Sequence, residues 1–473
     1  MFFRRFYDEG LAQASYLIGC DGSGEAVVID ANRDIAQYLS VAAAERLRIT
    51  RVTETHIHAD FVSGSRELAQ RTGAELLLSA EGGRDWQYAF AAGDGATLLH
   101  DGDTFHAGRV RFDVLHTPGH TPEHLAFLVT DLATSDRPVG LVSGDCVFVG
   151  DVGRPDLLER AAKVANTMED SAHSLFRSLQ RVRALPDFVQ LWPGHGAGSA
   201  CGKALGALPQ STIGYERVSN WGFTTTDETA FVNEVLAGQP EPPVYFAEMK
   251  RINRDGPPLL KGWPQPERLD PSLLEGVIAG GGIIVDTRAA DAFADGHVPG
   301  TLNIPLGKTF STWVGWLLPY DRAAFLIAAS QSDAASAARE MAKIGLDHVE
   351  GWFPAEALAA WANSGAKVER VAQASAKSIA ARVSNGEVTV VDVRNASEWE
   401  HGHLPGALHI PVGYLADRIS EIRRDRPVVV QCQGGTRSSI AASVLLAHGV
   451  GDVINLRGGY DEWTRESLPV AHD

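Results

Sequence analysis

Histidines and aspartates gather at four places in the first 200 residues, each directly after a strand-like run. The four places are residues 55–60, 117–121, 143–145 and 192–196. Imidazole nitrogens and carboxylate oxygens are the ligands that divalent metal ions take in proteins. A lone histidine is usually structural, but four such clusters at the ends of successive strands predict a metal site. The candidate ligands and neighbours are His56, His58, Asp60, His120, Asp145 and His195.

A second chemical motif lies near the end of the chain, where an apolar run at 428–430 leads into Gln-Cys432-Gln-Gly-Gly-Thr-Arg437. Glycines allow the backbone N–H groups of a tight loop to point inward, and the following helix adds positive potential at its N-terminus. Both effects favour a nucleophilic thiolate. The pattern predicts Cys432 as a nucleophile, in a cradle that can hold a cysteine persulfide or a bound sulfur oxyanion. Substrate is predicted to contact the loop residues Gln433, Gly434, Gly435 and Thr436.

The elements that must position these motifs form a layered α/β pattern. Residues 1 to about 200 alternate β-branched runs with helical stretches such as 35–48, and residues from about 200 to 250 resemble helical additions to the same domain. A segment rich in proline and glycine follows at 254–267 and predicts a linker.

An internal repeat follows the linker. The runs Ile-Val-Asp286-Thr-Arg288 and Val-Val-Asp392-Val-Arg394 lie 106 residues apart, and each is followed by Gly-His-x-Pro-Gly and then by an Ile-Pro pair. Such agreement predicts two copies of one fold. The loop of the first copy, 325–336, contains neither cysteine nor arginine, so this copy has no thiolate nucleophile there.

Composition narrows the classes of partner. At 473 residues the chain is expected to form about two to four domains. Its formal net charge of −17 argues against binding to nucleic acid or to an anionic membrane surface. No apolar run is long enough to span a bilayer, and Asp8 and Glu9 follow the first arginines where a signal peptide would be apolar. Four scattered cysteines predict free thiols in a reducing compartment, hence a cytoplasmic protein, and a homo-oligomer is compatible with the composition.

The histidine and aspartate clusters resemble those of the metallo-β-lactamase superfamily over roughly residues 1–245. Hydrolases of this superfamily with two metals carry histidine directly after the first aspartate, whereas this chain has Phe61 there, which cannot coordinate. The pattern is therefore similar to that of the persulfide dioxygenases. This resemblance implies one Fe(II) per chain, held by His56, His120 and Asp145, with three coordination positions left for substrate and O₂.

The resemblance also implies roles for neighbouring residues. His58, Asp60 and His195 would orient the ligands and water, although His58 is alternatively a fourth ligand. Arg154 matches an arginine that binds the carboxylates of the thiol, or else it caps a loop. Where relatives that use glutathione have tyrosine, this chain has Ala172, so the thiol is left open. Cys201 either accepts sulfur near the metal or packs as a small apolar residue. His116 and His124 are expected not to be ligands, and Cys146, after a buried strand, is expected to pack in the core.

The cysteine loop resembles that of rhodanese sulfurtransferases, in which the loop has six residues. This resemblance implies that Cys432 is the catalytic sulfur carrier and that Arg437 holds the loop and its bound anion. It also implies that the sister domain is a pseudo-rhodanese, which cannot carry sulfur. The expected fold is a multidomain α/β protein, with an αββα metallo-β-lactamase sandwich followed by two rhodanese-like α/β domains. The expected limits are 1–250 for the first domain, 251–267 for the linker, 268–366 for the inactive rhodanese and 372–473 for the active one.

The expected function is oxidation of a low-molecular-weight thiol persulfide by O₂ to sulfite, coupled to sulfur transfer through Cys432 with thiosulfate as product or donor. Two alternatives are a zinc thioester hydrolase similar to glyoxalase II with an appended sulfurtransferase, and a persulfide sensor without catalysis.

Overall fold

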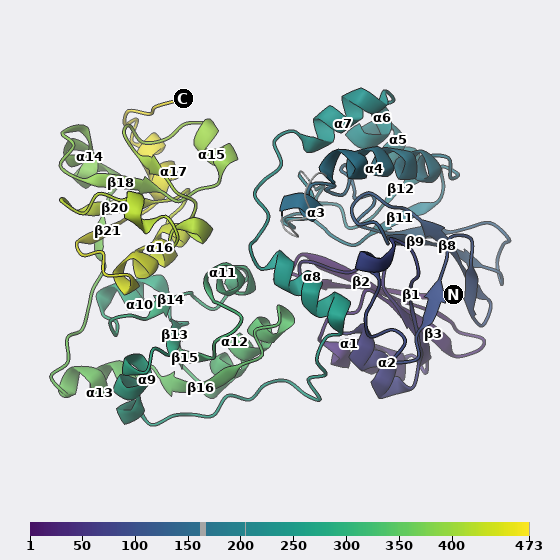
Figure 1. Ribbon diagram of the computed structural model, residues 1–473, viewed down its shortest axis with the longest axis horizontal. Coiled ribbons are helices and arrows are strands. Elements are labelled where there is room, and N and C mark those ends of the chain that lie inside the picture. Colours follow the sequence, from purple (N-terminus) through teal and green to yellow (C-terminus); the bar gives the residue numbers. More distant parts are fainter. Residues whose placement is uncertain (161–166, 204, 473) are drawn as a thin grey trace. The chain divides into compact units, whose positions relative to one another are not determined.

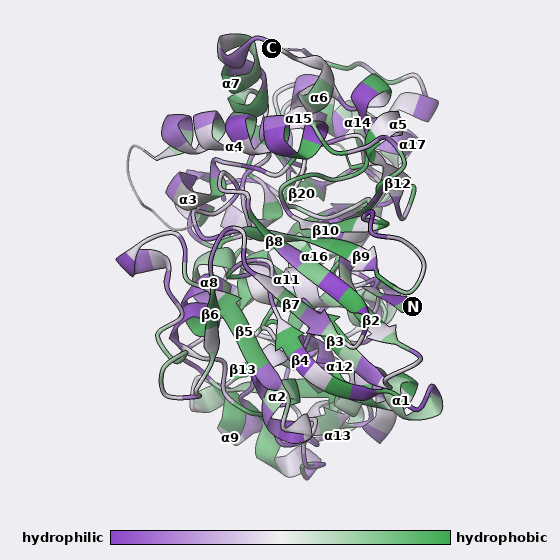
Figure 2. Ribbon diagram, turned by 90° about the vertical axis from the view of Figure 1, so that its right-hand side faces the viewer, coloured by the Kyte–Doolittle hydropathy of each residue, from purple (hydrophilic) through white to green (hydrophobic). Residues whose placement is uncertain are grey.

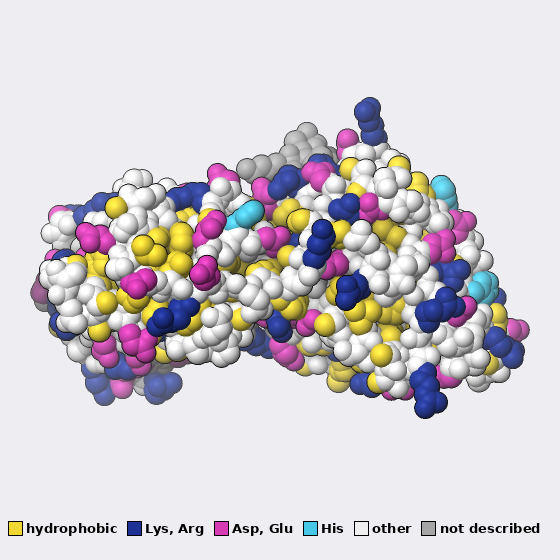
Figure 3. All heavy atoms as spheres, turned by 90° about the horizontal axis from the view of Figure 1, so that it is seen from below, with side chains coloured by type: hydrophobic (Ala, Val, Ile, Leu, Met, Phe, Trp, Pro, Cys, Tyr) yellow, Lys and Arg dark blue, Asp and Glu magenta, His cyan; other side chains and the backbone are white. Residues whose placement is uncertain are grey.

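The computed structural model describes residues 1–160, 167–203 and 205–472, which form two compact units. The first unit comprises Met1–Gly262 with Ala342–Gly345, and the second comprises the rest of the chain. Among the described residues, no helix is both long and apolar enough to cross a membrane. On the face drawn in Figure 3, acidic and basic side chains are interspersed over the surface.

The first unit contains two six-stranded sheets. In the first sheet the strands follow chain order: β1 (Phe2–Asp8), β2 (Gln13–Cys20), β3 (Glu25–Ile29), β4 (Arg48–Thr53), β5 (Glu75–Ser79) and β6 (Thr97–Leu99). The second sheet runs in the order β12 (Ser211–Thr212), β11 (Gln190–Pro193), β10 (Gly140–Gly144), β9 (Leu125–Asp131), β8 (Val110–His116) and β7 (Thr104–Ala107).

The two sheets bury their apolar faces against each other. Tyr16 and Ile29 of the first sheet share one core with Phe112 and Phe127 of the second. Strand β8 shows how the sequence produces this packing, because its apolar residues alternate with polar ones and the buried positions follow the same period of two. Figure 2 shows hydrophobic residues concentrated on strands such as β5 and β9.

Helices cover the outer faces of both sheets (Figure 1). Helices α1 (Ile35–Ala44) and α2 (Ser65–Thr72) pack on the first sheet, and α4 (Met168–Arg183) and α7 (Glu228–Leu236) pack on the second. Among the described residues, this unit also contains the α-helices α3 (Leu157–Arg160), α5 (Ile213–Ser219), α6 (Trp221–Thr224) and α8 (Phe246–Asp255). These layers confirm the predicted αββα sandwich.

Two element boundaries differ from the sequence expectation. The helix expected over 35–48 ends at Ala44, because the chain turns at Arg46, which has a positive φ, and β4 begins at Arg48. The stretch expected to be irregular from 251 is helical up to Asp255, and Gly256 with Pro257 and Pro258 then ends α8. The predicted limits of the domains stay predictions.

The second unit contains two parallel sheets, one in each copy of the repeat. The first has the order β14 (Leu302–Asn303), β13 (Ile283–Asp286), β15 (Ala324–Ala328), β16 (Val349–Pro354). The second has the order β17 (Ala372–Ala374), β21 (Val453–Leu456), β20 (Val428–Gln431), β18 (Thr389–Asp392), β19 (Leu408–His409).

Helices accompany the strands in both copies. The first copy has α9 (Leu274–Ala279), α10 (Ala290–Asp295), α11 (Phe310–Leu317), α12 (Gln331–Lys343) and α13 (Ala357–Asn363). The second copy has α14 (Ala376–Ser384), α15 (Ala396–Glu400), α16 (Thr436–Ala447) and α17 (Gly459–Arg465). Strand register proves the repeat, since Asp286 pairs with Ile327 and Asp392 pairs with Gln431. The expectation of two sister α/β domains is therefore confirmed.

Candidate functional site

The first histidine of the metal cluster is oriented by its own loop. His56 follows β4 and is buried, and its Nδ1 lies 2.9 Å from the hydroxyl of Thr55. The backbone N–H and the hydroxyl of Thr55 both donate to the carboxylate of Asp30, at 2.6 and 2.9 Å. Because Nδ1 is engaged, Nε2 of His56 is the ring nitrogen that can coordinate a metal ion.

His120 is presented by a turn that only glycine permits. At Gly119, φ is +142°, and a Cβ would lie 2.4 Å from the backbone of Leu175. Nδ1 of His120 donates to the backbone carbonyl of Arg154 at 3.1 Å, which again leaves Nε2 for the site.

Asp145 follows β10 and is completely buried. Its backbone N–H donates to Nε2 of His124 at 3.0 Å, and Nδ1 of His124 lies 2.8 Å from the hydroxyl of Thr117. His124 is therefore occupied at both ring nitrogens, in keeping with the expected non-ligand role. Neither carboxylate oxygen of Asp145 has a hydrogen-bond partner among the described residues.

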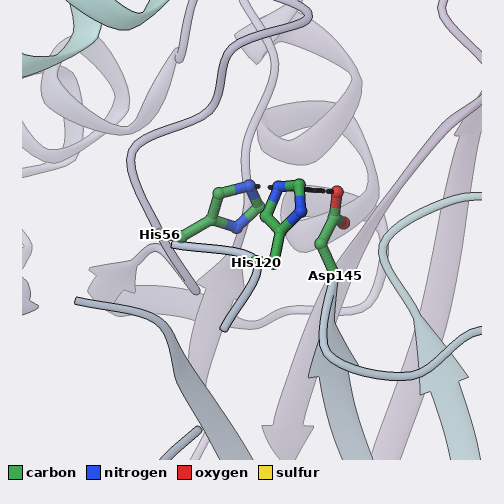
Figure 4. A group of neighbouring side chains, drawn as sticks. All are labelled: His56, His120 and Asp145. Carbon is green, nitrogen blue, oxygen red and sulfur yellow. Dashed lines mark ion pairs between the residues drawn. The ribbon is translucent and has the colours of Figure 1, made fainter. Parts of the chain in front are cut away.

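These three side chains converge on one point (Figure 4). Oδ2 of Asp145 lies 3.4 Å from Nε2 of His120 and 4.0 Å from Nε2 of His56, and one ligand atom of each lies within 4.8 Å of the others. Two ligand atoms that each bind one ion at about 2.1 Å can lie at most about 4.2 Å apart, and both distances from Asp145 are below this limit. The spacing therefore suits a single bound cation.

The electrostatics also fit a cation. Burial lowers the pKa of His120 to about 3 and lowers that of His56 well below its ordinary value, so both rings are neutral and offer lone pairs. Burial raises the pKa of Asp145 to about 6, although nearby His195 opposes the rise. Two buried carboxylate oxygens without a partner are costly unless a positive charge satisfies them. The residues present thus fit a divalent metal ion.

His58 stands outside this group of three. Its Nε2 lies 3.1 Å from Oδ1 of Asp30, and this carboxylate outweighs the opposing effect of burial, so that the pKa of His58 rises to about 9. Sequence reasoning missed Asp30, which supports both histidines of the loop. The available signal was an aspartate at the end of a strand-like run, at residues 26–30.

A second buried group lies beside the first. Asp60, His195 and Cys201 each offer a ligand atom, and these atoms lie within 4.8 Å of one another. Nε2 of His195 is 3.4 Å from Oδ2 of Asp60 and 3.4 Å from Oδ2 of Asp145. Burial first, and then the carboxylates of Asp60 and Asp145, raise the pKa of the Cys201 thiol. The structure thus brings the loop of Cys201 to the metal cluster.

Phe61 is fully buried, and its ring centroid lies 4.5 Å from that of His58. It supplies an apolar wall where a histidine would supply a ligand.

Arg154 is buried rather than open to a substrate. Its guanidinium forms a bidentate pair with Asp156 (3.0 and 2.7 Å) and donates to the carbonyls of Ala200 (3.1 Å) and Pro240 (2.6 Å). Because its own carbonyl accepts from His120, Arg154 connects a candidate ligand to the loop that carries Cys201. These contacts favour a positioning role over the predicted contact with the thiol's carboxylates.

The cysteine loop of the last domain has the predicted geometry of a cradle. Sγ of Cys432 accepts the backbone N–H of Gly435 at 3.1 Å and lies 3.6 Å from the hydroxyl of Ser438. At Gly435, φ is +106°, and α16 begins at the next residue, Thr436. The positive φ at Gly435 allows the loop to aim its N–H at sulfur.

Helix α17 holds this loop from outside, which sequence reasoning did not foresee. The backbone N–H groups of Tyr460 and Asp461, in its first turn, donate to the carbonyls of Cys432 and Gln433 at 2.8 and 3.0 Å. The side chain of Gln433 is also fixed, since its Oε1 accepts from Arg394 at 3.2 Å and its Nε2 donates to Asp461. Because α17 engages both carbonyls, they are held away from the sulfur, which accepts the N–H of Gly435.

Arg437 does not lie free beside the sulfur. Its two terminal nitrogens donate to the two carboxylate oxygens of Glu398, each at 2.6 Å. Glu398 also accepts from the backbone N–H of Asn395 and so closes a capping box at the start of α15. Sequence reasoning missed Glu398, and its position four residues after Arg394 gave only a weak signal.

The sister domain lacks the cradle as well as the cysteine. By strand register Ala328 occupies the position of Cys432, and α12 begins at Gln331, only three residues later. In the copy that contains Cys432 the helix begins four residues after the cysteine. The expectation of a loop without a sulfur carrier agrees with this geometry.

Comparison with known proteins places these folds in families. The model of the metallo-β-lactamase superfamily matches residues 8–195, and that of the rhodanese-like domain matches 270–362 and 375–466. A solved metallo-β-lactamase from Staphylococcus aureus subsp. aureus COL has 40% identity and a TM-score of 0.67, covering 75% of this chain and 99% of its own.

Two curated relatives match the separate parts. A "Probable metallo-hydrolase" of Burkholderia pseudomallei (strain 1710b) is 31% identical over 215 residues, which are 40% of this chain and 70% of that protein. A sulfurtransferase of Allochromatium vinosum is 41% identical over 95 residues, which are 20% of this chain and 89% of that protein. The chain belongs to the metallo-β-lactamase superfamily and carries two rhodanese-like domains in tandem.

Proposed function

We propose that the first unit oxidises a low-molecular-weight thiol persulfide with O₂ to sulfite at one ferrous ion, and that Cys432 carries sulfane sulfur in the last domain. The observation that supports this most is the buried group of two neutral imidazoles and one unpartnered carboxylate, in a chain that also holds an intact cysteine cradle. His56, His120 and Asp145 would hold the ion.

A ferrous ion bound there would supply the one-electron chemistry that allows triplet O₂ to react with a persulfide. The net reaction is RSSH + O₂ + H₂O → RSH + HSO₃⁻ + H⁺. The chain's own residues fix the ligand nitrogens, through Thr55 for His56 and through the Arg154 carbonyl for His120. Burial of all three ligands excludes bulk water from the reacting atoms.

A cavity of about 240 Å³ next to the His120 turn is proposed to hold the body of the thiol. Trp86, Pro118, Gly119 and Pro122 form its apolar wall, and Asp170 is the charged residue among those that line it. A carboxylate in the wall opposes a thiol that is itself rich in carboxylates. This supports a neutral or cationic thiol in preference to glutathione.

Sulfur transfer is proposed to run through the cradle. The thiolate of Cys432 attacks the outer sulfur of a donor, a new S–S bond forms, and the donor's S–S bond breaks with its electron pair leaving on sulfite or on the thiol. The reverse step moves sulfane sulfur from Cys432 to sulfite and gives thiosulfate. Because the two activities share one polypeptide, sulfite made by the first is at an effective concentration on the order of millimolar for the second.

The test is an oxygen-electrode assay on the iron-loaded full chain with several thiol persulfides. Equal molar amounts of O₂ consumed and sulfite formed, with one iron per chain, are expected. A protein with one iron that consumes no O₂ with any persulfide would contradict the oxygenase proposal.

We also propose a cytoplasmic location, where reduced thiols and persulfides occur.

A zinc thioester hydrolase is a second candidate, because Asp60, His195 and Cys201 could hold a second cation beside the first. Reconstitution with cobalt separates the two. A thiolate-to-cobalt charge-transfer band that is lost in Cys201→Ser, with two metals per chain and thioester turnover, would favour the hydrolase. One metal and no such band would favour the oxygenase.

A further inference from the structure

The internal repeat separates contacts that serve the rhodanese fold from contacts that serve its chemistry. In the active copy, Arg394 pairs with Asp392 through Nε (3.0 Å) and Nη2 (2.7 Å) and donates to the carbonyl of Gly402 (2.7 Å). In the inactive copy, Arg288 makes the same contacts with Asp286 and Gly296, at 3.0, 2.6 and 3.1 Å. A pair kept in a domain without a cysteine serves the fold.

The ion pair of Glu398 and Arg437, in contrast, has no counterpart in the inactive copy. Six residues after the repeat aspartate, the active copy has Glu398 and the inactive copy has Ala292. A helix forms at this place in each copy, α15 in the active copy and α10 in the inactive copy. The glutamate is therefore not needed to form the helix. The glutamate, the arginine and the cysteine are therefore present together in one copy and absent together in the other.

The contact has consequences for charge beside the sulfur. The pair is bidentate at 2.6 Å and about three-quarters buried, with side-chain exposures of 22% for Arg437 and 26% for Glu398. Burial raises the pKa of Glu398, but the guanidinium outweighs it and holds that pKa below its ordinary range, so the carboxylate is ionised at neutral pH. The arginine therefore contributes little net positive charge to the cradle.

We propose that Glu398 is a specificity-determining residue, which neutralises Arg437 so that the Cys432 cradle favours singly charged persulfide donors over the thiosulfate dianion. This inference rests on the proposed sulfur transfer through Cys432. The positive potential beside the sulfur then comes mainly from the start of α16 and from the Gly435 N–H, which donates to Sγ of Cys432. A dianion gains more than a monoanion from each unit of positive charge.

The two half-reactions differ in charge. With thiosulfate, Cys432–S⁻ and S–SO₃²⁻ give Cys432–S–S⁻ and SO₃²⁻, so three negative charges meet in the cradle. With a persulfide, Cys432–S⁻ and R–S–S⁻ give Cys432–S–S⁻ and R–S⁻, so two charges meet. In both cases one S–S bond forms as another breaks, and the leaving group takes the electron pair.

The experiment compares donors on the full-length protein under nitrogen, so that no O₂ is present to oxidise the persulfide in the first unit. Sulfur transfer to cyanide is measured with thiosulfate and with a neutral-tailed alkyl persulfide, for wild type, Glu398→Gln and Glu398→Asp. Loss of all transfer by the wild type would contradict the proposed function itself, whereas the ratio of kcat/KM values between donors tests the inference.

Glu398→Gln keeps the shape and removes the charge. We expect its KM for thiosulfate to fall by about threefold to tenfold, and its KM for the persulfide to change less. Added salt should reduce the fall in KM for thiosulfate, because salt screens the charge. Glu398→Asp keeps the charge and should keep the wild-type donor ratio. Glu421→Gln, which breaks the exposed bidentate pair with Arg418 in the same domain, is the matched control and should leave the ratio unchanged.

Two results would overturn the proposal. An equal loss of kcat with both donors in Glu398→Gln would mean that the glutamate only maintains the loop. A rise in KM for thiosulfate would mean that Glu398 presents Arg437 to the anion instead of neutralising it.

Discussion

At the scale of single residues, each candidate metal ligand is oriented before any ion arrives. His56 hydrogen-bonds to Thr55, which in turn hydrogen-bonds to Asp30, and His120 hydrogen-bonds to a backbone carbonyl. The backbone N–H of Asp145 donates to His124. Such supporting contacts determine which nitrogen faces the metal. The site is therefore preorganised.

Asp145→Ala should lower the iron content of the purified protein by more than about tenfold and remove persulfide-dependent O₂ uptake, because the site loses its anionic ligand. Metal analysis and the oxygen electrode on the same sample measure both effects. Asp136→Ala, at an exposed turn, is the control. Retained iron and uptake in Asp145→Ala would remove this residue from the ligand set.

Cys432→Ser should reduce thiosulfate-to-cyanide sulfur transfer to background, because a hydroxyl is a far weaker nucleophile than a thiolate. O₂ uptake should persist, since the metal cluster lies in the other unit. Cys20→Ser serves as the comparison, because it removes a free thiol outside both sites. If O₂ uptake disappears together with sulfur transfer, the division of the two activities is wrong.

At the scale of elements, the N-termini of two helices shape the cysteine cradle. Helix α16 begins just after Gly435, and the first turn of α17 holds the carbonyls of Cys432 and Gln433 away from sulfur. The close approach of α17 requires glycine. At Gly459, φ is +53°, and a Cβ would lie 2.1 Å from the carbonyl oxygen of Cys432.

Gly459→Ala should therefore displace the loop, lower kcat for sulfur transfer and cost about 1–3 kcal/mol of stability from backbone strain and steric conflict. Thermal unfolding and transferase kinetics measure the two effects. The control is Gly451→Ala, where a Cβ would meet nothing within 4 Å. An unchanged kcat in Gly459→Ala would show that α17 does not shape the active loop.

At the scale of the whole molecule, the rhodanese-like copy without a cysteine packs against the copy that contains Cys432. Within the second unit its strand β14 packs against α16, the helix that follows the cysteine loop, and the backbone N–H of Asn303 donates to the hydroxyl of Ser443 at 2.9 Å. Trp316 of the inactive copy also covers Gly413, where a Cβ would lie 2.1 Å from its ring. The inactive copy thereby supports the element that carries the active loop.

Ser443→Ala should destabilise the second unit by about 1–3 kcal/mol, because it leaves the buried N–H of Asn303 without its acceptor. Urea unfolding followed by tryptophan fluorescence measures the loss. Ser378→Ala, which removes an exposed hydroxyl from α14, provides the baseline. A midpoint equal to that of the baseline variant would mean that this contact between the copies contributes nothing.

Much of this organisation could be predicted because it depends on local pattern. Each motif consists of a few consecutive residues. This holds for the strand-end clusters around His56, His120 and Asp145, for the Asp-x-Arg repeat and for the glycine-rich loop of Cys432. Local spacing of apolar and turn residues determines which elements form, so the αββα sandwich and the two sister domains followed from it.

Only the tertiary structure decided which distant groups meet. Asp30 with His58, Cys201 with Asp60 and His195, and Glu398 with Arg437 are pairings between loops far apart in sequence. The burial of Arg154 belongs to the same class, since its partners include Ala200 and Pro240. The sequence by itself determined the folds and the chemical groups, because these depend on neighbouring residues, whereas the charge state and orientation of each group depend on contacts that exist only once the sheets and helices have packed.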